Sequence, residues 1–155
     1  MDALLVALEA TWWAQTLRTS RWGYAAVSAL HVLGLALLVG AIVPLNLRLL
    51  GFRRFVSHEV LTKVLAPVAA AGLAIAVLSG AALFAIRATE YAALGVVQVK
   101  LVLVAAGTLS ALAAHWRHGR GLGGASPWQL AVYGAISLGC WLSALVITPS
   151  SPLPA

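Results

Sequence analysis

Charged side chains are scarce in this sequence. The 155 residues include 10 Lys and Arg, 4 Asp and Glu, and 62% hydrophobic residues, so that charged residues make up only 9%. A soluble domain carries roughly 25% charged residues. The composition therefore excludes an ordinary soluble domain and is typical of an integral membrane protein, and the length suits one domain.

Other chemistry is missing as well. The single Cys140 excludes a disulfide framework, and no nucleophile–base pair or pair of carboxylates is present for hydrolysis or acyl transfer. No positively charged segment precedes the first apolar residues, so we expect no removable signal peptide. The net charge of +6 is interpreted as membrane-surface charge and does not indicate a nucleic-acid partner.

Four apolar runs are each long enough to cross a bilayer, if Lys100 is tolerated in the third. The predicted spans are residues 22–48, 62–87, 93–116 and 128–148, and residues 149–155 form a proline-rich tail. Pro44 and Pro67 lie within the first two spans and are expected to kink them. Because the links are short, we expect an all-α, up-down-up-down four-helix bundle that forms a single membrane domain over residues 1–155.

Residues 1–19 have a different pattern. Asp2, Glu9 and Thr16 recur every seven residues and would share one face of a helix. The opposite face would carry Leu4, Leu5, Leu8 and Trp12. This pattern predicts an N-terminal amphipathic helix that lies in the membrane interface.

Positive charge predicts the orientation. The first and third connections carry Arg48, Arg53, Arg54, Lys63, Arg117 and Arg120, whereas the opposite side carries Arg18, Arg21 and Arg87. The positive-inside rule places the richer side in the cytoplasm. We therefore expect a multi-pass protein of a bacterial inner (plasma) membrane with both termini outside.

Two ionisable residues interrupt the apolar runs. His31 lies in the first run and Lys100 in the third, and ionisable residues in hydrocarbon indicate a functional site by default. At 1.5 Å per residue, they lie about 12 Å and 10 Å below the same surface, so we expect them to share one pocket. Gly34, one turn below His31, would leave room there for a flat ligand.

Arg21, Arg87 and Tyr91 would lie above that pocket. A neutral imidazole in an apolar bundle, with cations toward the water, is the arrangement that holds b-type haem. Two alternatives stay open. His31 can instead hydrogen-bond a neighbouring helix, which composition and spacing alone favour, and Lys100 can extend to the surface past Gln98.

The other histidines, His58, His115 and His118, are predicted at the opposite end, about 20 Å from His31. A second axial ligand would therefore come from Lys100, a partner protein or a second copy of the chain. A copper or zinc site at the opposite end would require the three histidines to converge with Glu59. Histidines among lipid headgroups are the favoured interpretation.

Short motifs resemble a known family. Ala29-Leu30-His31-Val32, Pro44-Leu45-Asn46-Leu47-Arg48 and Val99-Lys100-Leu101-Val102-Leu103-Val104 resemble the four-helix haem-dependent protoporphyrinogen oxidases and the broader copper-resistance D-like membrane families. The segment from His31 to Gly51 is more similar to a bacterial four-helix membrane family in which an aspartate usually stands at the position of Asn46. The resemblance to the oxidases implies that His31 ligates haem b and that Lys100 is required.

The hypothesis is an integral membrane protein that binds haem b and acts in electron transfer or as a haem-dependent oxidoreductase on a membrane-phase substrate. His31 would be the metal ligand, and Lys100 a distal ligand, propionate partner or catalytic proton donor. Expected partners are the lipid bilayer, a redox protein or quinone, and a second copy of the chain. A metal-handling or transport protein and a cofactor-free anchor subunit of a larger complex are the alternatives.

Overall fold

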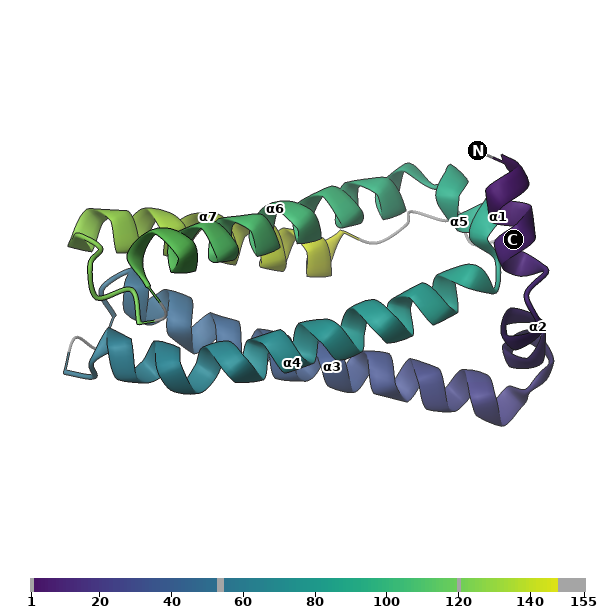
Figure 1. The fold of residues 1–155 in the computed structure, drawn as a ribbon, viewed down its shortest axis with the longest axis horizontal. Helices are drawn as coiled ribbons and strands as arrows, with labels where there is room; N and C mark the ends of the chain where they lie inside the picture. Colours follow the sequence, from purple (N-terminus) through teal and green to yellow (C-terminus); the bar gives the residue numbers. More distant parts are fainter. Residues whose placement is uncertain (1, 53–54, 120, 148–155) are drawn as a thin grey trace, which may run out of the picture. The chain divides into compact units, whose positions relative to one another are not determined.

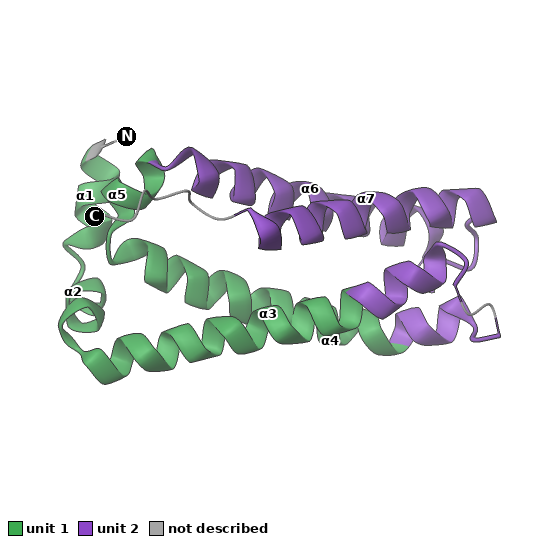
Figure 2. Ribbon diagram, turned by 180° about the vertical axis from the view of Figure 1, so that it is seen from behind, with its two compact units in different colours: residues 1–42, 64–93 green, residues 43–63, 94–155 purple. Residues whose placement is uncertain are grey.

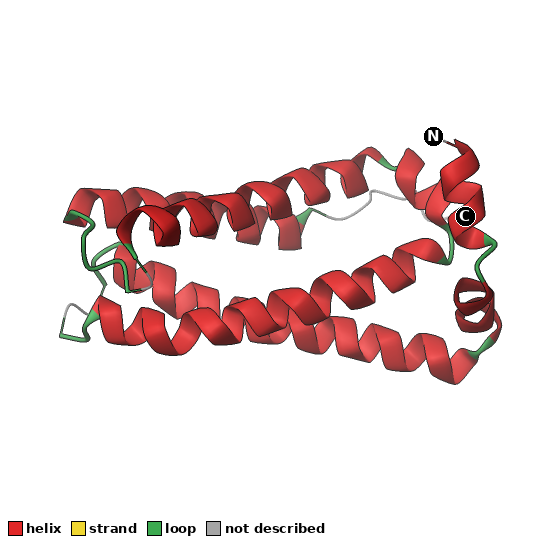
Figure 3. Ribbon diagram, viewed as in Figure 1, coloured by secondary structure: helices red, strands yellow, loops and turns green. Residues whose placement is uncertain are grey.

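The structure is a computed structural model that describes residues 2–52, 55–119 and 121–147. Its regular elements, within these residues, are all helices (Figures 1 and 3). They are α1 (Asp2–Glu9), α2 (Trp12–Thr19), α3 (Arg21–Leu49), α4 (His58–Ala85), α5 (Ala88–Ala93), α6 (Gly95–His118) and α7 (Pro127–Val146). The all-α prediction is confirmed for the described part of the chain.

Four of the helices are long and apolar enough to cross a membrane. These are α3, α4, α6 and α7, which confirms the predicted number of membrane-length segments among the described residues. The largest shift is at the start of α4, which begins at His58 instead of residue 62. Pro44 and Pro67 both lie inside helices, whereas the up-down order of the four helices stays a prediction.

The N-terminal segment forms two short helices, so the prediction of one continuous helix over residues 1–19 is wrong. The break falls between Glu9 and Trp12. Thr11 has extended backbone angles of φ −65° and ψ 143°, and its Oγ1 donates to the Leu8 carbonyl at 2.7 Å. A threonine hydroxyl that bonds nearby backbone competes with helical bonding, which accounts for the interruption.

The chain divides into two compact units (Figure 2). Unit 1 comprises residues 1–42 and 64–93, and unit 2 comprises residues 43–63 and 94–155. The helices α3 and α4 each contribute their longer part to unit 1 and their shorter part to unit 2.

Unit 1 is organised around a close contact between α3 and α4. A Cβ atom added to Gly34 would lie 2.6 Å from the Ala76 nitrogen, and one added to Gly72 would lie 2.5 Å from the Leu38 nitrogen. No side chain fits at such distances, so these glycines allow the two backbones to touch. Small residues have this role where membrane helices pack closely.

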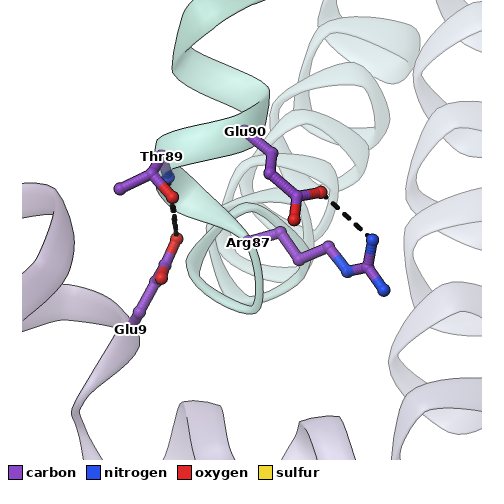
Figure 4. A network of polar contacts seen from close by, with 4 residues as sticks. All are labelled: Glu9, Arg87, Thr89 and Glu90. Carbon is purple, nitrogen blue, oxygen red and sulfur yellow. Dashed lines mark hydrogen bonds and ion pairs between the residues drawn. The ribbon is translucent and has the colours of Figure 1, made fainter.

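One carboxylate joins two short helices of unit 1, α1 and α5. Glu9, at the end of α1, accepts hydrogen bonds from the Thr89 backbone N–H at 2.8 Å and the Thr89 hydroxyl at 2.7 Å (Figure 4). These two bonds hold the pKa of Glu9 below its ordinary value of 4.5 because they favour the charged form. The carboxylate thus satisfies a backbone donor at the start of α5.

Unit 2 contains α6 and α7, which pack through larger side chains. Gly107 of α6 lies against the Trp141 indole of α7, at 3.0 Å from its Nε1 to an added Cβ. The end of α3 joins α7 through a hydrogen bond of 3.0 Å from Asn46 Nδ2 to Ser137 Oγ. Asn46 and Ser137 are both buried, so this bond lies inside the apolar unit.

The glycine-rich link between α6 and α7 is anchored by Leu122. This side chain is only 2% exposed and packs in a cluster with Leu49, Ala114 and Leu130. Its φ of +56° is left-handed, which is uncommon for a residue with a side chain. Burial of this apolar side chain offsets the cost of the unusual backbone conformation and attaches the described part of the link to the neighbouring helices.

Candidate functional site

His31 is on α3 in unit 1, and its side chain contacts α4. It is ten residues after Arg21, about 15 Å along α3 at 1.5 Å per residue. Its Nδ1 atom is 2.9 Å from the Ala76 carbonyl oxygen and 3.1 Å from Ser79 Oγ, both on α4. The hydrogen bond to a neighbouring helix, which the sequence left open as an alternative, is therefore present.

The partners of Nδ1 fix the tautomer of the ring. A carbonyl oxygen can only accept, so Nδ1 must carry the proton that is shared with Ala76. In the neutral ring, Nε2 then has the free lone pair. No hydrogen bond to Nε2 is formed by the part of the chain that the structure describes. The ring is thus held through one nitrogen and retains a second nitrogen that can bind a ligand.

Gly80 makes this arrangement possible. A Cβ atom added to Gly80 would lie 3.0 Å from His31 Cε1 and 3.4 Å from Nδ1. In a helix the carbonyl of residue 76 points toward residue 80. The absence of a side chain at Gly80 therefore gives the imidazole lateral access to the Ala76 carbonyl.

The site departs from the predicted one at Gly34. The space beside this glycine is filled by the α4 backbone at Ala76 and Gly72, so the predicted opening for a flat ligand is not there. The glycine that touches the imidazole is Gly80, on the neighbouring helix. Sequence reasoning followed the face of one helix and could not identify a residue that approaches from another.

Three predicted residues lie toward the α5 end of unit 1, outside direct contact with the histidine. Arg21 is exposed at the start of α3. Arg87 Nη1 forms an exposed ion pair of 3.1 Å with Glu90 (Figure 4), and Tyr91 stacks at 6.3 Å on Phe84. Exposed pairs contribute about 0.2–1 kcal/mol, so Arg87 can be released to a stronger anionic partner.

Lys100 belongs to unit 2. It lies five residues after Gly95, the first residue of α6, and is half-buried. It forms no hydrogen bond or ion pair with residues 2–52, 55–119 or 121–147. His31 is in the other unit, so the pairing of these two residues stays a prediction.

The remaining histidines, His58, His115 and His118, are all in unit 2. His58 Nε2, His115 Nδ1 and His118 Nε2 are buried without a hydrogen-bond partner among the described residues. The His118 ring packs edge-on against Tyr133 at 5.9 Å. No group of three or more His, Cys, Asp or Glu that could hold a metal ion occurs in the described ranges. The predicted alternative of a copper or zinc site with Glu59 is therefore not formed there.

Sequence reasoning missed Ala76, Ser79 and Gly80. A signal was present for the serine, because Ser79 is the one polar side chain between Val64 and Ile86. A lone hydroxyl in a membrane-length apolar run indicates a partner on another helix. The backbone carbonyl of Ala76 leaves no such signal.

The fold and the site define a helical protein with four membrane-length helices and one histidine that is hydrogen-bonded between two of them. Comparison with known proteins finds no matching family, no matching curated protein and no matching solved structure. The resemblance to haem-dependent oxidases therefore stays a prediction from the sequence motifs.

Proposed function

We propose that this chain is a b-type haem-binding integral membrane protein that acts in electron transfer or in oxidation of a membrane-phase substrate. His31 Nε2 is the proposed iron ligand. The observation that carries the proposal is the bond from His31 Nδ1 to the Ala76 carbonyl at 2.9 Å. Metal-bound histidines almost always donate their other ring N–H to a carbonyl, carboxylate or water, which orients the ring and makes the ligand more basic.

Other residues of unit 1 are also suited to bind haem. Arg21 and Arg87, near helix ends on the α5 side of His31, supply cations for carboxylates such as haem propionates. Bound haem would supply one-electron chemistry. This chain would hold the ligand nitrogen, exclude water with its apolar helices and place positive charge near the surface. Lys100 is proposed as a distal ligand, propionate partner or catalytic proton donor.

The membrane setting is supported by exposed aromatic side chains near the helix ends. Trp22, Trp116 and Trp128 are exposed by 85%, 95% and 68%, and indole rings are enriched where the bilayer meets water. We place the protein in a bacterial inner membrane with both termini outside. Its proposed partners are the lipid bilayer, a redox protein or quinone, and a second copy of the chain.

Absorption spectra of the oxidised and reduced protein, purified from haem-replete cells, test the function. Wild type should show a Soret band, His31→Ala should lose it, and His115→Ala, a matched histidine variant in unit 2, should retain it. A colourless wild type overturns the proposal. Lys100→Met, which removes the amine nitrogen and keeps a long apolar side chain, should shift the spectrum. An unchanged spectrum and activity would show that Lys100 is not part of the site.

One observation favours a second candidate, a cofactor-free anchor subunit of a larger complex. The bond from His31 to α4 joins two helices whether or not a ligand is present. In that case the wild type is colourless, and His31→Ala lowers stability in detergent by about 0.6 to 2 kcal/mol, the range for polar contacts between membrane helices.

A further inference from the structure

We infer that Ser79 is a positioning residue that sets the electron-donating strength of His31 and, through it, the redox potential of the bound group. The part that concerns the potential rests on the proposed function. The part that concerns the protonation of His31 does not, because it follows from the hydrogen bonds of unit 1 alone.

The direction of the Ser79 hydroxyl is fixed by its own helix. Ser79 Oγ lies 2.5 Å from the Ile75 carbonyl and 3.3 Å from the Ala76 carbonyl, and both oxygens can only accept. The hydroxyl hydrogen is therefore used within α4. A lone pair on Oγ is left for His31 Nδ1, which lies 3.1 Å away.

The Nδ1 proton of His31 thus has two acceptors, the Ala76 carbonyl and the Ser79 oxygen. Ser79 is only 3% exposed, and hydrogen bonds in such an environment are electrostatically stronger than in water. Two acceptors on Nδ1 raise the electron density at Nε2. A more basic Nε2 favours the more positive, oxidised form of a bound metal and so lowers its midpoint potential.

Ser79→Ala tests this role because it removes one acceptor and leaves the Ala76 carbonyl in place. The haem should be retained, while the ratio of reduced to oxidised protein at a fixed potential should rise about 2- to 10-fold, the range expected for one hydrogen bond. Ser79→Thr should restore the wild-type ratio. Ser79→Cys, a weaker acceptor, should give an intermediate value and provides a second variant if the alanine form does not fold.

The matched control is Thr108→Val in α6. Thr108 Oγ1 donates to the Val104 carbonyl at 2.7 Å, which is the same type of bond within a helix that Ser79 makes to Ile75. Thr108 has no imidazole partner among the described residues. Its replacement should leave the potential unchanged if Ser79 acts through His31.

A second measurement needs no haem. Nitrogen-15 NMR of histidine-labelled apoprotein, with His31 assigned from His31→Ala, should show the proton on Nδ1 in wild type and a shifted Nδ1 signal in Ser79→Ala. A colourless wild type overturns the proposed function but leaves this measurement to decide the role of Ser79. A proton on Nε2 in wild type, or an unshifted Nδ1 signal together with an unchanged potential, overturns the inference.

Discussion

The two compact units hold their helices together in different ways. In unit 1, Gly34 and Gly72 bring the backbones of α3 and α4 into contact, and His31 bonds a main-chain carbonyl. In unit 2, a tryptophan lies over Gly107, and two buried side chains, Asn46 and Ser137, bond each other. Backbone contact allows a side chain of one helix to reach the main chain of the next.

This difference explains why the ligand is proposed in unit 1. His31 donates a hydrogen bond through one ring nitrogen and keeps a lone pair on the other, and imidazole nitrogen suits iron better than the amide and hydroxyl oxygens of the unit 2 pair. In lipid, helix association relies on van der Waals packing and hydrogen bonds between helices. A residue that holds two helices together and also keeps a nitrogen lone pair free for a metal is suited to bind a cofactor.

The largest effect is expected from Gly72→Ala, which breaks the backbone contact of unit 1. The added Cβ would lie 2.5 Å from the Leu38 nitrogen and 2.8 Å from the Gly34 oxygen, so the helices must separate. Overpacking of this kind costs about 1–3 kcal/mol, and denaturant unfolding in detergent measures it. Gly40→Ala is the control, because nothing lies within 4 Å of its added Cβ; equal destabilisation by both variants would contradict the packing argument.

A smaller loss of stability is expected from Ser137→Ala, which breaks the polar bond of unit 2. The buried Asn46 amide would lose its partner at 3.0 Å, at a cost of about 0.6 to 2 kcal/mol. Haem content should stay at the wild-type level because the proposed iron ligand, His31, is in unit 1. Ser143→Ala, at an exposed position on the same helix, should unfold like wild type, and loss of haem from Ser137→Ala would show that the site depends on unit 2.

Gly80→Ala should change haem binding at His31 more than it changes the stability of the fold. The added Cβ would lie 3.0 Å from His31 Cε1, so the ring must shift by a few tenths of an ångström. We expect an altered Soret band and a haem affinity lower by about tenfold, with unfolding changed by under about 1 kcal/mol. Haem titration of the purified apoprotein measures the affinity, and wild-type binding would show that Gly80 does not shape the site.

The smallest effect concerns the attachment of α1 to α5. The hydrogen bonds from Thr89 lower the pKa of Glu9 below its ordinary value of 4.5. The charged carboxylate therefore stabilises the contact between α1 and α5 fully at pH values above 4.5. The contribution is lost as the pH falls through the lowered pKa. The protection of α1 amides, corrected for the intrinsic pH dependence of hydrogen exchange, should therefore decrease at acid pH in wild type.

Glu9→Gln has no such titration, so the protection of its α1 amides, corrected in the same way, should depend less on acid pH than that of wild type. Glu90→Gln is the control, because Glu90 pairs only with the exposed Arg87 within the described residues. A wild-type acid response in Glu9→Gln would assign the effect to another group.

The sequence predicted the membrane-length helices well, whereas it did not predict which residues His31 contacts. Apolar runs gave four membrane-length helices with bounds that differ from the structure by one to four residues. His31 was identified because an ionisable side chain is conspicuous in such a run. Gly34 was assigned to ligand space and instead packs against α4, since a glycine signals close approach but does not specify what approaches.

Local features of the chain, its composition and the length of its apolar runs, are enough to produce helices long and apolar enough for a bilayer, because each helix satisfies its own backbone groups. Which ring nitrogen of His31 is free depends instead on how α3 packs against α4. That choice depends on a carbonyl 45 residues away at Ala76, which a missing side chain at Gly80 leaves accessible. A main-chain oxygen is the same at every position of the chain, so only packing could select the one that His31 bonds.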